Sequence, residues 1–222
     1  MPEQKIKGVL FDIDGTLYYQ LPLRCFMGFF LIVLNIFHPK SLIRKIKIIM
    51  HYRKAQEIIR YLPDTENISF ETQIAFVSNK LDESPELVKE TVLEWMHSRP
   101  LKFIRYFRRR KAEYVIKKLY HSNIRLGTYS DYPGVSKLRA IGLLKYMSVN
   151  TCSTDKDIKS FKPASKGFLV TAQKMDLKPS EILYVGDREE IDGIGAKKAG
   201  MQVVIINSFE ELLDFPIMQD MK

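Results

Sequence analysis

The amino-acid sequence predicts an α/β fold with a parallel sheet and a separate helical insert. From residue 124 onward, short apolar segments alternate with segments of helical spacing, which is typical of parallel strands joined by helices. Residues 22–98 instead show helical spacing and no strand-like alternation. The expected strands of the sheet are residues 6–11, 124–129, 147–151, 182–186 and 203–207. The helices expected around them are residues 112–121, 133–141, 165–175 and 192–199, with a short helix and a frayed end over residues 209–222.

The predicted insert contains an apolar segment followed by a basic helix. Residues 25–37 carry no charge, but these 13 residues are fewer than the ~20 that a membrane-spanning helix needs. A helix is expected over residues 42–61, with Ser41 as its N-cap. A basic stripe follows one face of this helix, formed by Arg44, Lys47 and Lys54. Two further helices are expected, over residues 70–81 and 85–97, the second with Ser84 as its N-cap and Pro85 at its first position.

Positive charge is concentrated in the insert and in the segment that follows it. The chain has a formal net charge of +9, and residues 21–112 contain 17 Lys and Arg against nine Asp and Glu. Such an excess suits an anionic substrate, a nucleic acid or an anionic membrane surface, and it is equally typical of a solvated helical face. Cys25 and Cys152 form neither a disulfide framework nor a metal-ligand spacing, and residues 1–7 lack the apolar region of a signal peptide. We therefore expect a cytoplasmic protein, with a membrane-peripheral location as the alternative.

A pair of carboxylates follows the first predicted strand. Asp12 and Asp14 are two residues apart, and Gly15 permits a tight turn that brings Asp14 round toward Asp12. Two close carboxylates repel each other unless a cation lies between them or one of them keeps its proton. The pattern therefore fits a Mg²⁺ site or a nucleophile beside a general acid, and by itself it also fits a simple Asp-Gly hairpin turn.

Three further motifs follow in order along the chain. They are Ser130-Asp131, Lys162-Pro163, and Gly186-Asp187 with Asp192 beyond it. Together with Asp12-Ile13-Asp14-Gly15-Thr16, this series resembles the four ordered motifs of the haloacid dehalogenase-like (HAD) superfamily, in its phosphatase type with a helical cap inserted after the first motif. The resemblance covers residues 5–20 and about 110–207. It implies a Rossmann-like α/β core at residues 1–20 and 100–222 and an α-helical cap domain at residues 21–99.

The resemblance assigns a role to each motif residue. Asp12 is the expected nucleophile and Asp14 the general acid and base. Because a departing alkoxide needs a proton and a departing halide does not, Asp14 favours phosphate esters as substrates. The residues expected to bind phosphate are Ser130, Asp131 and Lys162, with Thr128 as a competitor for the role of Ser130. Mg²⁺ is the expected cofactor, held by the Asp12 carboxylate, the Asp14 backbone carbonyl and Asp187.

Asp192 has three interpretations that the sequence leaves open. It would support the Mg²⁺ site from behind through a water, pair with Lys162, or cap a helix. Glu189 and Glu190 lie close enough in sequence to compete for the same role.

The predicted function is that of a Mg²⁺-dependent phosphatase. It would hydrolyse a phosphate monoester of a small molecule through an aspartyl-phosphate, in a class resembling phosphoglycolate phosphatases, and no nucleic-acid partner is expected. One alternative is a phosphomutase acting on a sugar phosphate, because it would need the same core residues. Another is a membrane-peripheral or partner-binding protein on the same scaffold, whose basic insert contacts an anionic membrane surface. The sequence leaves the oligomeric state open.

Overall fold

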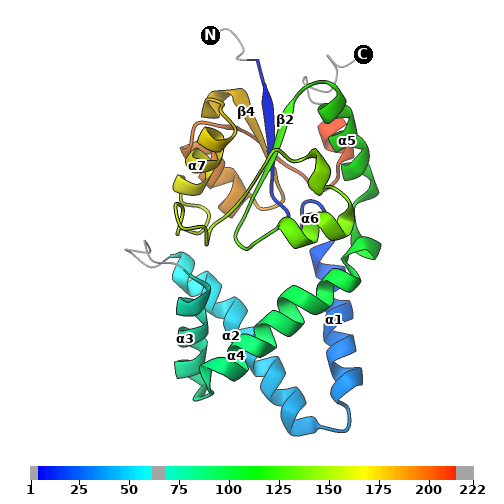
Figure 1. Ribbon diagram of the computed structural model, residues 1–222, viewed down its shortest axis with the longest axis vertical. Coiled ribbons are helices and arrows are strands. Elements are labelled where there is room, and N and C mark those ends of the chain that lie inside the picture. Colours follow the sequence, from blue (N-terminus) through cyan, green and yellow to red (C-terminus); the bar gives the residue numbers. More distant parts are fainter. Residues whose placement is uncertain (1–4, 62–68, 214–222) are drawn as a thin grey trace. The chain divides into compact units, whose positions relative to one another are not determined.

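The computed structural model describes residues 5–61 and 69–213, and the chain divides into two compact units. The sheet unit comprises residues Met1–Tyr19 and Arg108–Lys222, and the helical unit comprises residues Gln20–Phe107. Both are drawn in Figure 1.

The sheet unit is built on a parallel sheet, as predicted. Among the described residues, five strands pair in the order β3-β2-β1-β4-β5, and every pair is parallel. The strands are β1 (Gly8–Phe11), β2 (Arg125–Ser130), β3 (Val149–Cys152), β4 (Ile182–Gly186) and β5 (Gln202–Ile205). In the central strand, Phe11 lies beside Thr128 of β2 and Val185 of β4. The carboxyl ends of these three strands therefore lie at one edge of the sheet, which is where open α/β sheets bind ligands.

The two faces of the sheet pack against different helices. Leu10, Tyr129 and Tyr184 lie in one core cluster with residues of α7 (Lys166–Lys174) and α8 (Ile194–Lys198). Successive strand residues point to opposite faces, and Phe11 accordingly stacks on Phe209 at 6.4 Å between ring centroids. The helix α5 (Arg110–His121) lies across the sheet from α7 (Figure 1). The remaining α-helices described in this unit are α6 (Val135–Ile141) and α9 (Glu210–Leu213).

One helix of the sheet unit begins later than predicted. A π-helical turn occupies Glu189–Gly193, and α8 starts only at Ile194, whereas the sequence predicted a helix from Asp192. In this turn the Asp192 side chain accepts a hydrogen bond from the backbone N–H of Arg188. Such wide turns often lie at functional sites. The predicted frayed end lies largely in residues 214–222, outside the described residues.

The helical unit contains only helices and turns in its described part, as the missing strand alternation predicted. Its α-helices are α1 (Gln20–Asn35), α2 (Pro39–Arg60), α3 (Phe70–Leu81) and α4 (Pro85–Val92). After α4 the chain continues through a π-helical turn at Leu93–Ser98 and two 3₁₀ turns at Arg99–Lys102 and Ile104–Phe107. No described helix combines the length and hydropathy needed to cross a bilayer.

The ends of these helices test the predicted caps. The Ser84 hydroxyl accepts a hydrogen bond from the N–H of Leu87, as a cap before Pro85 should. The predicted cap at Ser41 is wrong, because α2 begins at Pro39 with His38 before it. Proline suits the first position of a helix, where its missing N–H has no partner to lose.

Aromatic side chains pack around the buried Trp95 in the helical unit. The Phe30 ring lies 5.4 Å from that of Phe103 and 6.2 Å from that of Trp95. The Arg99 guanidinium stacks 4.6 Å from the centre of the Trp95 ring. The inward side of α1 is thus held by packing within the unit.

Candidate active site

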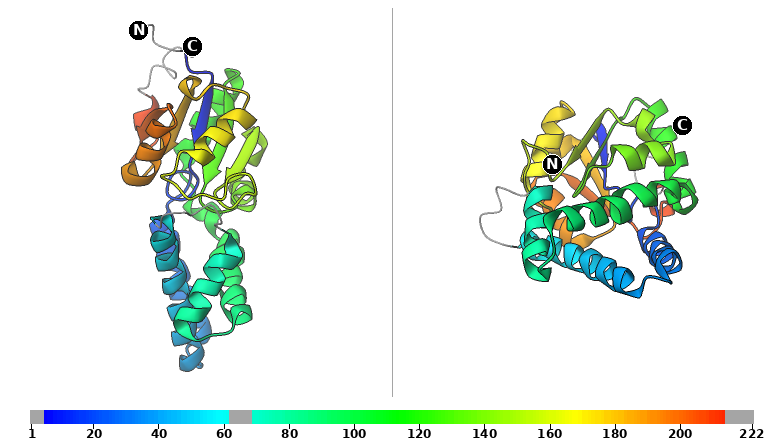
Figure 2. Two further views of the ribbon diagram at one scale, coloured as in Figure 1. Left: turned by 90° about the vertical axis from the view of Figure 1, so that its left-hand side faces the viewer. Right: turned by 60° about the horizontal axis from the view of Figure 1, so that its bottom comes forward.

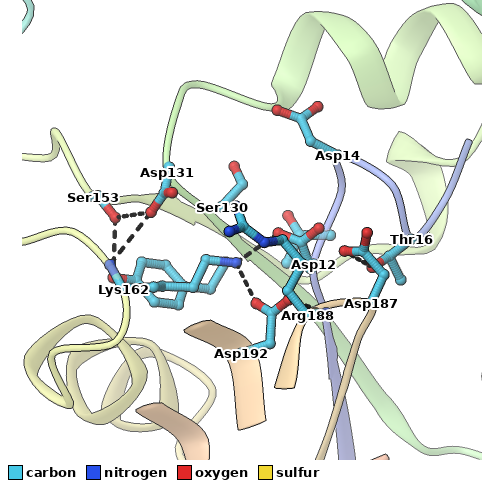
Figure 3. A network of polar contacts seen from close by, with 12 residues as sticks. Asp12, Asp14, Thr16, Ser130, Asp131, Ser153, Lys162, Asp187, Arg188 and Asp192 are labelled. Atoms are coloured by element: carbon cyan, nitrogen blue, oxygen red, sulfur yellow. Dashed lines mark hydrogen bonds and ion pairs between the residues drawn. The ribbon is translucent and has the colours of Figure 1, made fainter. Parts of the chain in front are cut away.

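Three predicted site residues meet at the carboxyl edge of the sheet. Asp12 directly follows β1, Asp187 directly follows β4, and Asp192 reaches in from the π-helical turn (Figure 3). One carboxylate oxygen from each of the three lies within 4.8 Å of the others. Asp12 and Asp192 are buried and Asp187 is half-buried. The parallel register explains this meeting, since β1 and β4 are neighbours.

The ammonium of Lys162 joins Asp12 to Asp192. Its Nζ donates to Asp12 Oδ1 at 2.6 Å and to Asp192 Oδ1 at 2.7 Å, and the residue is 2% exposed. It also donates to the Tyr184 hydroxyl at 3.0 Å, which in turn donates to Asp192 Oδ1 at 2.8 Å. The rings of Tyr129 and Tyr184 lie 5.5 and 5.7 Å from the nitrogen. A single buried cation is therefore fixed by two anions, a hydroxyl and two aromatic rings.

Burial and crowded charges shift the pKa values of this cluster. Burial raises the pKa of Asp12 well above its usual value; Lys162 opposes this rise, and Asp192 and Asp187 add to it. Burial also raises the pKa of Asp187, again with a contribution from Asp192. Burial by itself would lower the pKa of Lys162, but Asp12 and Asp192 outweigh it and raise that pKa well above its usual value. Lys162 therefore stays charged, while three carboxylates share one ammonium.

The donor set fits a Mg²⁺ ion. Mg²⁺ prefers a few carboxylate oxygens and completes its shell with water and phosphate, and a further cation would offset the charge that Lys162 leaves unbalanced. Asp192 already accepts hydrogen bonds at both oxygens, since Oδ2 binds the N–H of Arg188 at 3.2 Å. Asp12 and Asp187 are therefore the carboxylates best placed to hold the ion. The contacts of Asp192 are those of a partner for Lys162, the second of its three interpretations.

The Gly-Thr pair of the first motif makes room for Asp187. Gly15 has a φ of 100°, and a Cβ at this residue would lie 2.2 Å from Asp187 Oδ2. The Thr16 hydroxyl donates to Asp187 Oδ1 at 3.3 Å. The loop after β1 thus approaches the end of β4 more closely than any side chain at residue 15 would allow.

Asp14 is turned away from Lys162 (Figure 3). Both of its carboxylate oxygens accept hydrogen bonds from Lys137 Nζ at 2.6 Å, and the Tyr18 hydroxyl donates to Oδ1 at 2.5 Å. Lys137 belongs to α6. The two carboxylates of the first motif therefore have separate cationic partners, Lys162 for Asp12 and Lys137 for Asp14.

The residues expected to bind phosphate differ in their contacts. Lys162 faces Asp12, as described above. The hydroxyl of Ser130 donates to the backbone carbonyl of Tyr132 at 2.5 Å. Asp131 accepts hydrogen bonds from the Ser153 hydroxyl and from the N–H of Lys162, and it thereby ties two loops together (Figure 3).

Some residues of this site were not identified from the sequence. Tyr184 lies in the apolar run of β4. A hydroxyl in the middle of a buried strand needs a polar partner, so the sequence did contain a signal for this residue. Lys137 and Tyr18 carried no comparable signal. Thr128, the competitor of Ser130, is fully buried and donates to Asn150 Oδ1 at 3.0 Å.

Comparisons with known proteins find one matching family and several similar proteins. The family described as haloacid dehalogenase-like hydrolase matches residues 9–206. A glyceraldehyde 3-phosphate phosphatase from Methanopyrus kandleri is 26% identical over 204 residues, which cover 90% of this chain and 84% of that protein. The solved structure of a HAD phosphatase from Thermococcus onnurineus has a TM-score of 0.58 at 25% identity, covering 91% of this chain and 86% of that one. The putative hydrolase YfnB from Bacillus subtilis, solved with bound magnesium, has a TM-score of 0.67 at 15% identity, covering 97% of this chain and 99% of that one.

Proposed function

Because this chain belongs to the haloacid dehalogenase-like hydrolase family, we propose that it is a Mg²⁺-dependent phosphatase acting on a phosphate monoester of a small molecule. The observation that carries the proposal is the contact of 2.6 Å between Asp12 and Lys162, with Asp187 beside it. A carboxylate nucleophile and a phosphate repel each other, and a buried ammonium next to both reduces that repulsion. The names of the matched proteins from M. kandleri and T. onnurineus support the same type of reaction.

The reaction would proceed in two displacements. In the first, an oxygen of Asp12 bonds to phosphorus, the bond from phosphorus to the ester oxygen breaks, and Asp14 gives a proton to the departing alkoxide. In the second, Asp14 takes a proton from water, the water oxygen bonds to phosphorus, and the bond to Asp12 breaks. Inorganic phosphate leaves and both carboxyl groups are regenerated. Asp14 must give up its contact with Lys137 and contact the substrate before it can take part.

The remaining motif residues would hold the phosphoryl group. The raised pKa of Lys162 keeps its ammonium charged beside Asp12. Ser130 would exchange its hydrogen bond to Tyr132 for one to a phosphoryl oxygen, and Asp131, an anion, would contribute its backbone N–H. Mg²⁺ bound by Asp12, Asp187 and the Asp14 carbonyl would neutralise part of the phosphoryl charge.

The sequence predicts that residues 21–99 form a cap domain. This cap, the helical unit, would contact the leaving half of the substrate. The sheet edge supplies a generic phosphate site, so discrimination between esters has to come from other residues. Phosphoglycolate and small sugar phosphates are the first substrates to examine, the latter because of the name of the M. kandleri relative. The fold itself selects none of them.

A screen for phosphate release tests this proposal. Phosphorylated metabolites are incubated with the protein and Mg²⁺, and the screen is repeated with EDTA and with the Asp12→Asn variant. We expect release from at least one metabolite, abolished by both changes. Transfer of phosphate to a sugar without release would identify a phosphomutase, and full activity of Asp12→Asn would contradict the mechanism.

A further inference from the structure

The outer side of α1 is apolar and exposed. Phe29, Ile32 and Val33 follow the three- and four-residue spacing of one helix face, and Ile36 and Phe37 continue it into the turn before α2. All five are exposed, Phe29 by 65% and Phe37 by 89%. These five residues are called the apolar face below.

Packing of the helical unit does not explain the apolar face. α1 buries its opposite side, where Leu23, Met27 and Leu31 recur every four residues. The core is therefore supplied by one side of the helix, and the other side is equally apolar. An exposed apolar surface that continues along a helix and its following turn is typical of an interaction site.

The outer side of α2 combines cations with apolar residues. Lys40, Lys47 and Lys54 recur every seven residues and so share one side of the helix, and all three are exposed. Ile43 and Met50 lie between them on that side, and both are exposed. These five residues are called the basic face below.

Both faces point away from the core of the helical unit. On α2 the buried residues Ile48, Tyr52 and Ala55 lie on the side opposite the basic face. Figure 2 shows α1 and α2 on one side of the helical unit and α4 on the other. The apolar face and the basic face thus belong to the same layer of helices.

The charge of this layer indicates what binds it. From residue 21 to residue 56 the chain contains seven Lys and Arg and no Asp or Glu. An anionic bilayer accepts apolar side chains below its headgroups and cations among them. A second copy of the chain fits less well, because a symmetric dimer would place like charges against each other. With 16 residues, α1 is shorter than the ~20 needed to span a bilayer, so it would lie on the surface.

We propose that the apolar face and the basic face bind the surface of an anionic lipid bilayer, with α1 and α2 lying in the headgroup region. This binding is separate from the phosphatase reaction. Vesicle binding and phosphate release can therefore fail independently.

Flotation of the full-length protein with lipid vesicles tests the proposal. Vesicles of phosphatidylcholine containing phosphatidylserine should bind the protein, and vesicles of phosphatidylcholine alone should bind it far less. Binding should weaken as salt is raised, because screening removes part of the attraction. Lys40→Gln/Lys47→Gln should weaken binding by about thirtyfold, since each cation near an anionic surface contributes ~1 kcal/mol and 1.4 kcal/mol corresponds to tenfold. Ile36→Ser/Phe37→Ser should weaken it as strongly at every salt concentration.

Matched variants elsewhere in the helical unit serve as controls. Lys80→Gln/Lys89→Gln removes two exposed lysines of α3 and α4, and Tyr106→Ser removes an aromatic ring that is 84% exposed. Both should bind vesicles like the unchanged protein. Arg44 is left intact in all variants because it pairs with Glu83 at 2.9 Å.

The natural cysteines provide a second measurement. Cys25 is exposed, and its position four residues before Phe29 places it beside the apolar face, whereas Cys152 is buried. A polarity-sensitive fluorophore attached to Cys25 should shift to the blue with anionic vesicles. Absence of both this shift and flotation would overturn the proposal, as would wild-type flotation by both face variants. A dimer in sedimentation that Ile36→Ser/Phe37→Ser dissociates, without any vesicle binding, would assign the faces to self-association and overturn it too.

Discussion

Lys162 binds the carboxylate of Asp12 from a position 150 residues further along the chain, with 2.6 Å between Nζ and Oδ1. The contact is buried, and the same nitrogen binds Asp192 at 2.7 Å. A fixed cation of the protein therefore lies against the proposed nucleophile, and substrate is not needed to position it.

Replacing the proposed nucleophile should remove activity and leave the fold intact. Asp12→Asn keeps the shape of the side chain and loses the attacking charge, so kcat should fall by ~10⁴-fold or more, the range seen when members of a catalytic group are removed. Circular dichroism should remain unchanged. Asp157→Asn, at an exposed carboxylate paired with Lys174, is the matched control and should keep full activity. Substantial turnover by folded Asp12→Asn would exclude a phosphorylated Asp12.

Substitutions of Asp187 and Asp192 should have different effects, because we propose that Asp187 binds the metal and Asp192 supports Lys162. Asp187→Asn should strongly raise the Mg²⁺ concentration needed for half-maximal activity. Asp192→Asn should raise it less, by the ~10–100-fold typical of residues that orient metal ligands. Asp192→Asn should also lower the melting temperature in EDTA, because it weakens the contacts of a buried ammonium. Mg²⁺ titrations that give the opposite order would exchange the two roles.

Gly15 should tolerate no side chain. In Gly15→Ala the new Cβ would meet Asp187 Oδ2 at 2.2 Å, and the residue would keep an unfavourable positive φ, so both activity and stability should fall. Gly28→Ala is the control, and its effect on stability should have the opposite sign, because a Cβ there meets nothing within 4 Å. As a substitution inside α1 it should raise stability by up to ~1 kcal/mol. Thermal melts compare the two variants, and equal stability of both would contradict the close approach of Gly15 to Asp187.

The stabilisation that Mg²⁺ provides should depend on pH. The raised pKa values of Asp12 and Asp187 mean that the folded protein keeps their protons to a higher pH than the unfolded chain does. Without metal, their contribution to stability is therefore lost as the pH rises from about 4, the unfolded value, through the raised folded values. Mg²⁺ needs both groups ionised, so the rise in melting temperature that it causes should grow with pH over the same window. Melts with Mg²⁺ and with EDTA at several pH values measure this, and an increment that is constant over pH would contradict it.

Tyr184 should affect catalysis through Lys162. Tyr184→Phe keeps the ring and removes the hydroxyl that contacts both Lys162 and Asp192. A hydrogen bond to a charged group contributes ~1.5–3 kcal/mol, so kcat should fall by about tenfold or more while KM changes little. Tyr129→Phe is the matched control, because its hydroxyl binds Ser153 and the carbonyl of Ser160 instead. Equal kcat values for the two variants would show that Tyr184 acts only in packing.

The sequence predicted the sheet well because short, largely apolar segments such as β1 and β4 alternate with segments of helical spacing. The same property placed Asp12 and Asp187 at strand ends, and parallel pairing brought them together. The start of α2 was mispredicted because His38-Pro39 resembles a helix stop, although proline also begins helices. Lys137 could not be identified, because its contact with Asp14 spans 123 residues and depends on how α6 packs. The outward side of α1 was also unpredictable, since a uniformly apolar segment does not show which of its sides is buried.

The chain leaves and re-enters the sheet unit through segments that touch. Tyr18 forms an antiparallel bridge with Arg108, and the N–H of Arg109 donates to the carbonyl of Leu17 at 3.1 Å. The ends of the insertion are therefore already joined, whatever lies between them. The entropy of closing a loop grows only slowly with its length, so a longer, shorter or unrelated insertion would require no change in the strands. A single recombination event at this junction would replace the whole of residues Gln20–Phe107 during evolution. Asp12 and Asp187 would remain unchanged.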